Sequence, residues 1–239
     1  TAADCLAFDD AVESEVMPEV GKLQLHRREQ LGVERLRPWD LGVDPLNRPP
    51  LRPFDGISQM VEKTQRIFDR LDPELADGFR KMHELRLLDL DNRKRKGPGG
   101  YQMPLAEARL PFVFMYAVGI QRDVETILHE AGHAFHALAT QQEDVYPYRN
   151  PPIEICEVAS MSMELLGNEY LEEFYPAPEA SRARRNHMEG IINILPWIVT
   201  VDAFQHWIYT HPGHTRGERT AAWLEAMQPS FAAALANAG

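Results

Sequence analysis

Apolar residues recur at helical spacing through most of the chain, which predicts a mainly α-helical protein. A capping box of Thr1 and Asp4 is expected to start a first helix that runs to about Leu31 and bends at Pro18. The five prolines between residues 36 and 54 predict a connecting loop. Further helices are expected over residues 57–71 and 73–88, and from Arg122 onward in four segments separated near residues 147–152, 176–178 and 211–217.

A short central region predicts β-structure. Glycines at 97, 99 and 100 interrupt apolar pieces over residues 88–103, which indicates a small hairpin or a close approach of the backbone to a neighbour. Residues 111–118 are aromatic and β-branched and form the best strand. The predicted fold class is therefore mainly α with a minor α+β part. One region spans residues 1–239, with helices at 1–87, a small β-sheet at about 88–118, and further helices at 122–171 and 178–238.

Charge and cysteine content narrow the function. The chain has 36 acidic and 25 basic residues, and this acidic balance argues against a nucleic-acid partner. Only Cys5 and Cys156 are present, so no disulfide framework is expected. We find neither an apolar run of membrane length nor a leader pattern, so no membrane partner and a cytoplasmic location are expected.

The expected helix from Arg122 carries the sequence His129-Glu130-Ala131-Gly132-His133. On a helix, the two histidines lie one turn apart and can bind one metal ion, while Glu130 can reach a water on that metal. Zinc is the expected ion because two imidazoles, one carboxylate and an open fourth position are its usual hydrolytic arrangement. Zinc would lower the pKa of the water and polarise a peptide carbonyl, and Glu130 would act as the general base.

The surroundings of this motif support a buried site. Apolar neighbours make much of the helix surface buried, so the histidines and Glu130 need partners there. Gly132 costs the helix about 1 kcal/mol relative to alanine, which predicts a closely packed neighbouring element. His136 lies on the same face but about 10.5 Å along the helix from His129, too far for one zinc ion. It is a candidate for orienting a ligand or facing the substrate.

The third ligand distinguishes the classes of zinc peptidase. A metzincin would need glycine and histidine at the positions that hold His136 and Ala139, so that class is excluded. A gluzincin takes a glutamate from a second helix, and a helix following Pro152 would place Glu154 and Glu157 on one side. Spacing alone does not choose between these two glutamates.

Several segments together resemble the thimet oligopeptidase and oligoendopeptidase F family of zinc metallopeptidases. The resemblance rests first on residues 129–136 and on Glu157-Val158-Ala159-Ser160. It extends to the segments at 89–93, 98–101, 110–114 and 202–207, and so covers most of the chain.

This resemblance implies that His129, His133 and Glu157 hold one Zn²⁺ per chain and that Glu130 is the catalytic base. It also implies a peptide that docks antiparallel along an edge strand at residues 110–118, and a short-peptide substrate. The expected activity is that of a zinc-dependent endopeptidase. Further residues that it suggests for orienting a ligand or facing the substrate are Glu164, Glu125, Tyr101 and Ala117.

The chain departs from the family in one respect. Family members are longer and carry a later segment with tyrosine and histidine that stabilises the oxyanion, whereas this sequence has no tyrosine after Tyr209. Remaining segments of a longer chain are therefore one expected partner. The alternative is a peptide-binding or structural zinc domain without catalytic competence, and a third reading is a helical domain that binds no metal.

Overall fold

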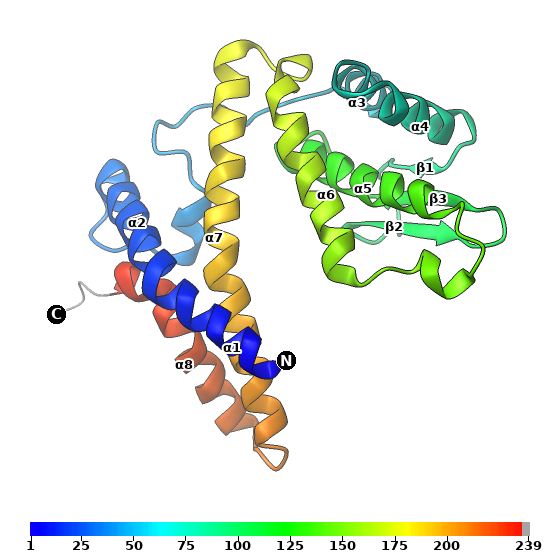
Figure 1. Cartoon of the computed structure of the whole chain (residues 1–239). Coiled ribbons are helices and arrows are strands. Elements are labelled where there is room, and N and C mark those ends of the chain that lie inside the picture. The colour runs from blue at the N-terminus through cyan, green and yellow to red at the C-terminus, as the bar shows by residue number, and fades with distance from the viewer. Residues whose placement is uncertain (236–239) are drawn as a thin grey trace. The chain divides into compact units, whose positions relative to one another are not determined.

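The computed structural model describes the backbone of residues 1–235 and the side chains of residues 1–228. It divides into two compact units: Pro50–Arg185, and Thr1–Pro49 together with the described residues from Asn186 onward. Helices dominate both units, so the predicted mainly α fold class is confirmed (Figure 1). The prediction that residues 1–239 form a single catalytic region stays a prediction.

The unit Pro50–Arg185 has a small sheet with helices beside it (Figure 1). Asp72 caps α4 by accepting hydrogen bonds from the backbone N–H groups of Glu74 and Leu75. Phe68 packs against Phe79 and Phe135 at ring-centroid distances of 5.1 and 5.0 Å, which joins α3, α4 and α5 in one core. The elements are α3 (Ile57–Leu71), α4 (Pro73–Glu84), β1 (Leu88–Asp89), β2 (Gly100–Leu105), β3 (Leu110–Met115), α5 (Gln121–Thr140), η3 (Tyr146–Arg149), α6 (Ile153–Gly167), η4 (Asn168–Glu173) and the start of α7 (Ala177–Thr210).

The sheet has the strand order β1-β3-β2. β1 pairs with β3 in parallel, and β2 pairs with β3 antiparallel from Gly100 opposite Met115 to Leu105 opposite Leu110. The hairpin predicted within residues 88–103 is therefore wrong, because the hairpin joins β2 to β3. The edge strand predicted at residues 110–118 is also wrong: β3 is paired on both sides, and the edge beside α5 belongs to β2.

The other unit is helical in its described part. Its elements are α1 (Ala2–Ala11), a π-helical segment η1 (Val12–Val16), α2 (Met17–Leu31), η2 (Pro38–Gly42), the part of α7 from Asn186, and α8 (Arg216–Leu235). The predicted capping box of Thr1 and Asp4 is present. Pro18 stands in the first turn of α2, directly after the π-helical segment, so the helix changes its hydrogen-bonding pattern there instead of continuing as regular α-helix.

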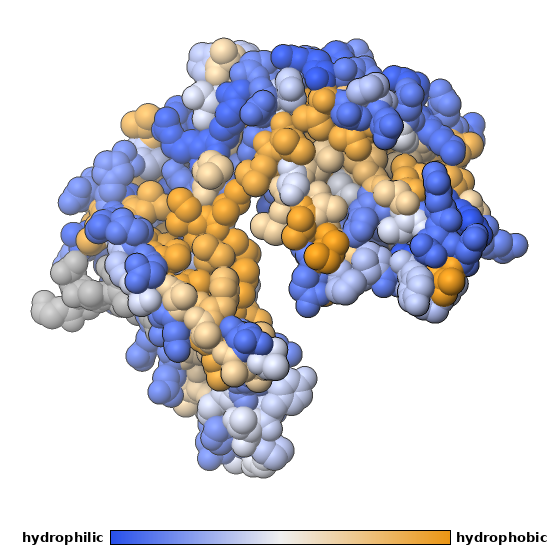
Figure 2. Space-filling view, in the orientation of Figure 1, coloured by the Kyte–Doolittle hydropathy of each residue, from blue (hydrophilic) through white to orange (hydrophobic). Residues whose placement is uncertain are grey.

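Apolar side chains are both packed and exposed in this unit. Trp223 packs against Trp197 and Phe204 at ring-centroid distances of 5.8 and 5.0 Å, which ties α8 to α7. Figure 2 shows apolar residues gathered on the surface along α7, where Ile194 and Ile198 are exposed. None of the helices in the described part of the chain combines the length and apolarity that a membrane crossing requires.

Candidate metal centre

Helix α5 carries the two histidines of the motif on a well-anchored segment. Before it begins, the backbone N–H groups of Val118, Gly119 and Ile120 all donate to Asp123 Oδ2 at 2.7–2.9 Å. Ile127 and Leu128 bury the opposite side of the helix in the core. The histidines are thereby held at one position relative to the sheet.

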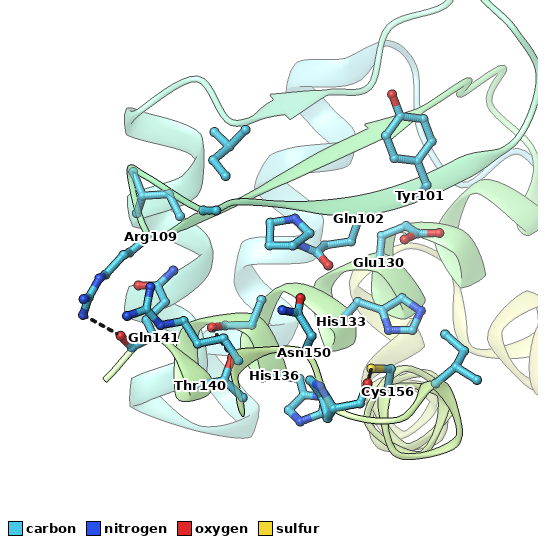
Figure 3. A pocket seen from close by; sticks show the side chains of 18 of the residues that line it. Tyr101, Gln102, Arg109, Glu130, His133, His136, Thr140, Gln141, Asn150 and Cys156 are labelled. Carbon is cyan, nitrogen blue, oxygen red and sulfur yellow. Dashed lines mark hydrogen bonds between the residues drawn. The ribbon is translucent and has the colours of Figure 1, made fainter. Parts of the chain in front are cut away.

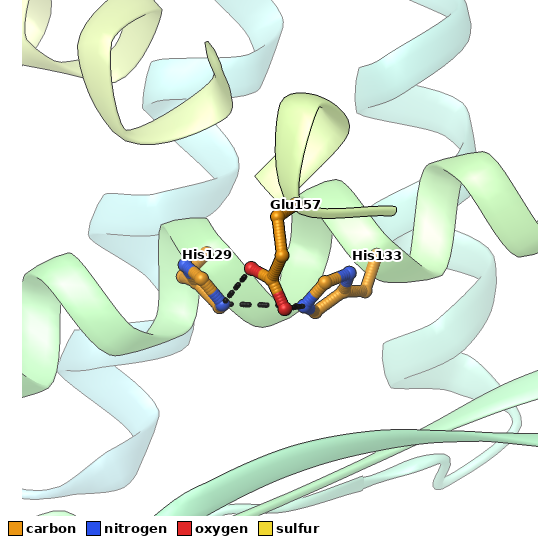
Figure 4. Close-up of side chains that lie close together, drawn as sticks. All are labelled: His129, His133 and Glu157. Carbon is orange, nitrogen blue, oxygen red and sulfur yellow. Dashed lines mark hydrogen bonds and ion pairs between the residues drawn. The ribbon is translucent and has the colours of Figure 1, made fainter. Parts of the chain in front are cut away.

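Three side chains from α5 and α6 converge on one point (Figure 4). His129 Nε2 lies 3.1 Å from His133 Nε2 and 3.4 Å from Glu157 Oε2, and His133 Nε2 lies 3.7 Å from Glu157 Oε1. Ligand atoms about 2.0–2.1 Å from a tetrahedral zinc ion stand about 3.3–3.4 Å apart. The donor set and its spacing therefore fit zinc. Glu154, the other glutamate that the helical spacing allowed as third ligand, is not part of this cluster.

A hydrogen bond from outside the cluster orients His129. His129 Nδ1 lies 2.6 Å from Glu164 Oε1, so an Nδ1–H donor there leaves the Nε2 lone pair facing the other two residues. Burial lowers the pKa of His129, but the hydrogen bond to Glu164 and nearby carboxylates outweigh it and raise the pKa above its usual value. Burial and the charge of His129 lower the pKa of His133, which favours the neutral ring that a metal needs.

Ser160 also belongs to the site, although the sequence pattern predicted no role for it. Its hydroxyl is fully buried and lies 2.8 Å from Glu157 Oε2 and 3.0 Å from the Glu157 carbonyl oxygen, three residues earlier on α6. It therefore fixes the rotamer of the carboxylate. The signal that could have revealed it is the spacing of a hydroxyl one turn after a ligand candidate.

Glu130 is buried beside the cluster and points to the sheet edge. It accepts a hydrogen bond from the Gln102 backbone, and its Oε2 atom is buried without a hydrogen-bond partner in the described structure. Burial raises the pKa of Glu130 to about 7. A carboxylate poised near neutral pH is suited to take and return a proton.

Close backbone packing brings these elements together, as Gly132 predicted. A Cβ atom on Gly132 would lie 2.6 Å from the Ala159 carbonyl oxygen and 2.7 Å from Ser160 Cα. A Cβ atom on Gly100 would lie 2.7 Å from Thr126 Cγ2 and 3.1 Å from Glu130 Oε1. The predicted close approach of the glycine-rich segment is therefore confirmed at Gly100, and glycine lets both α6 and β2 reach α5.

The other predicted site residues differ in whether they line the cavity beside the metal cluster. His136 and Tyr101 line the cavity beside the cluster, and Tyr101 stacks on Phe114 at 4.8 Å. Glu125 accepts hydrogen bonds from the side chains of Gln121 and Arg122. Ala117 is buried, and its N–H donates to the Leu90 carbonyl oxygen. The roles of these residues stay predictions, as do those of the metal ligands and Glu130.

A cleft extends to both sides of the cluster. A cavity of about 450 Å³ lies between β2, the later turns of α5 and the start of α6, and Figure 3 shows Tyr101, Gln102, His133 and Cys156 among its walls. A second cavity of about 460 Å³ lies beside Val118 and Thr126. Gly100, His129 and Glu130 line both cavities, so the cluster sits between two spaces.

Comparisons with known proteins find relatives over part of the chain. Oligopeptidase PepF of Bacillus subtilis (strain 168) is 30% identical over 141 residues, which are 59% of this chain and 21% of that protein. The chromosomal oligoendopeptidase F of Lactococcus lactis subsp. cremoris is 26% identical over 116 residues, 48% of this chain and 19% of the relative.

Solved structures match over nearly the whole chain. A structure of PZ peptidase A with an inhibitor is 32% identical with a TM-score of 0.89, and the match covers 95% of this chain and 40% of that one. A structure from Bacillus anthracis str. Ames, provisionally named an oligoendopeptidase F, is 27% identical with the same TM-score. This match covers 95% of this chain and 42% of that one.

The chain thus spans less than half the length of the solved chains it matches. The family model described as peptidase family M3 matches residues 2–236. This chain belongs to peptidase family M3.

Proposed function

We propose that this chain is the catalytic region of a zinc-dependent endopeptidase that hydrolyses short peptides. The observation that carries the proposal is the convergence of His129, His133 and Glu157 within 4.8 Å of one another, beside the buried carboxylate of Glu130. These three residues would hold the zinc ion. When bound, zinc supplies a Lewis acid that activates water and polarises the peptide carbonyl.

The residues of the chain account for the rest of the chemistry. Glu130, buried and with one oxygen free of partners, takes the proton of the attacking water and returns it to the leaving amine. Glu164 and Ser160 keep His129 and Glu157 in place. The cavities on both sides of the cluster leave room for peptide before and after the cleaved bond, which favours an endopeptidase over an exopeptidase.

The free edge of β2 is the expected docking site for the substrate main chain. An extended peptide that adds a strand there makes main-chain hydrogen bonds, which tolerate many side-chain sequences. This fits the relatives that are named as oligopeptidases.

A test separates hydrolysis from metal binding. The zinc-loaded chain should cleave a quenched fluorescent peptide, and Glu130→Gln should keep about one zinc per chain and lose turnover by at least about a hundredfold. Retained turnover in Glu130→Gln would contradict the mechanism. Zinc and peptide binding with no chelator-sensitive cleavage in the wild type would favour the alternative of a non-catalytic peptide-binding domain.

A further inference from the structure

The cavity of about 450 Å³ runs away from the metal cluster toward the end of α5. At the near end of the cavity Gly100 meets Glu130. At the far end the guanidinium of Arg109 donates to the carbonyl oxygen of Gln141, the residue that follows α5, at 3.0 Å. Figure 3 shows Arg109 and Gln141 on the opposite side of the pocket from Glu130 and His133. The two ends of one cleft therefore carry different charged groups.

The far end holds two guanidinium groups whose charge is not neutralised. Arg149 lines the same cavity and donates to the segment that directly follows Gln141, through Nε to the Glu143 carbonyl oxygen at 2.6 Å and through Nη2 to the Asp144 carbonyl oxygen at 3.3 Å. Both arginines are thus fixed by backbone carbonyls. Among the described side chains, no ion pair joins either arginine to a carboxylate. Each guanidinium has five N–H donors, so several remain for a ligand.

The register of the sheet fixes which main-chain groups of β2 face a peptide. Tyr116 N–H donates to the Gly99 carbonyl oxygen, while Val113 N–H donates to Leu87 on the β1 side. Since hydrogen-bonded and non-bonded pairs alternate, residues 100, 102 and 104 of β2 turn their main-chain groups to the free edge. Pro104 has no N–H to donate, and the N–H of Gln102 already donates to Glu130. Main-chain recognition therefore weakens at Pro104, and side chains have to supply the affinity beyond it.

Antiparallel pairing sets the direction of the peptide, because it is slightly more stable per residue than parallel pairing and is how β2 already pairs with β3. A peptide antiparallel to β2 has its N-terminal part at the Leu105 end and passes the metal cluster toward Gly100. The eight residues from His133 to Gln141 span about 12 Å of helix. An extended peptide covers this length with about three or four residues. Arg109 and Arg149 therefore face the third or fourth residue before the cleaved bond.

We propose that Arg109 and Arg149 form a subsite for an acidic side chain, Asp or Glu, at the third or fourth residue before the cleaved bond. The proposal rests on the proposed peptidase function. A carboxylate is the ligand that a pair of carbonyl-anchored guanidinium groups binds best, because each can offer two parallel donors.

The test uses a set of quenched fluorescent peptides that carry one Glu, or one Gln in its place, at each of the second to fifth positions before the cleaved bond. For the wild type, Glu at the third or fourth position should raise kcat/KM about three- to tenfold over Gln, and added salt should reduce this preference. The double variant Arg109→Gln/Arg149→Gln should lose the preference. Arg109→Lys/Arg149→Lys should keep part of it, because the charge remains.

The matched control is Arg52→Gln, an exposed arginine of the same unit that does not line the cleft. It should keep the full preference for Glu. Absence of any Glu preference in the wild type, or a preference that survives in the Arg109→Gln/Arg149→Gln variant, would overturn the subsite.

Binding to the Glu130→Gln variant, followed by fluorescence anisotropy of labelled peptides, separates this proposal from the proposed function. A Glu preference in binding without cleavage by the wild type would support the subsite and contradict the peptidase activity. Cleavage without a Glu preference would contradict the subsite alone.

Discussion

Two groups of acidic and histidine side chains lie in the two units, and they differ in geometry more than in composition. In one unit, His129, His133 and Glu157 direct their ligand atoms to a common point. In the other, Asp9 of α1 hydrogen-bonds Asp202 of α7, whose Oδ2 lies 3.4 Å from His206 Nε2. In the described part of the chain, three ligand atoms come within 4.8 Å of one another only in the first group.

The comparison shows what turns such residues into a metal site. The first group is held by Glu164 and Ser160 from outside and opens to a cleft. In the second group two carboxyl groups lie together, and their like charges favour one protonated carboxyl group over two charged ones. We expect zinc at the first group and proton sharing at the second.

The largest expected effect is the loss of zinc when the third ligand is removed. Glu157→Gln takes away the anionic ligand, and the zinc content after dialysis should fall from about one per chain to near zero. Glu154→Gln is the matched control, because Glu154 lies less than one turn away on the same helix and outside the cluster. Elemental analysis measures both variants. Equal zinc in the two variants would show that Glu157 is not a ligand.

Gly132→Ala should disturb the packing that brings α6 to α5. The new Cβ atom meets backbone atoms of Ala159 and Ser160, which cannot move without shifting α6. Overpacking of this kind costs about 1–3 kcal/mol, more than the helix propensity that alanine gains. Gly190→Ala in α7 is the control, since no atom lies within 4 Å of its added Cβ. Chemical denaturation should show Gly132→Ala destabilised and Gly190→Ala unchanged or stabilised.

A smaller effect is expected from the hydroxyl that holds the ligand. Ser160→Ala removes the hydrogen bond to Glu157 without changing the packing much, and losing such an outer contact typically weakens metal binding about 10–100-fold. Competition with a zinc chelator measures this affinity. Ser162→Ala, an exposed hydroxyl on the same helix, should leave it unchanged. Equal zinc affinity in Ser160→Ala and the wild type would mean that Glu157 needs no support.

The second group should show itself in the pH dependence of stability. Burial, the hydrogen bond to Asp202 and its charge raise the pKa of Asp9 to about 6, and Glu13 adds to this while His206 opposes it. The folded protein then binds a proton that the unfolded chain has released. This stabilisation is complete below about pH 4 and is lost as the pH rises through about 6.

Asp9→Asn keeps a hydrogen-bond donor toward Asp202 and removes the titration. Relative to the wild type it should gain about 2–3 kcal/mol of stability between pH 4 and pH 7. Thermal unfolding over this pH range measures the difference, and Asp10→Asn, an exposed neighbour, is the control. A difference between Asp9→Asn and the wild type that does not change with pH would rule out the shared proton.

Much of the fold could be predicted from local sequence. Capping at Thr1 predicted the start of α1, and the prolines between helices and the 3.6-residue period predicted limits close to those of α3, α5 and α6, because these signals act within a few residues. Strand pairing is set by contacts between distant segments. The chain alone did not show that β1 would pair with β3 and leave the edge to β2.

The candidate site likewise has features that local sequence predicts and features that depend on packing between distant segments. The spacing of His129 and His133 is local and was readable, whereas the choice of Glu157 over Glu154 depends on how α6 packs on α5. Ser160 and the carboxyl pair of Asp9 and Asp202 depend on side-chain orientation and on helices far apart in sequence.

The central claim is that two imidazoles and one carboxylate hold zinc in this chain. X-ray absorption at the zinc edge of the zinc-loaded protein tests it most directly. The site predicts two histidine nitrogens and carboxylate oxygen at about 2.0–2.1 Å, and His133→Ala, which keeps only two of the three ligands, should bind almost no zinc. A sulfur neighbour at about 2.3 Å, which would indicate Cys156, or an unchanged spectrum in His133→Ala would contradict the claim.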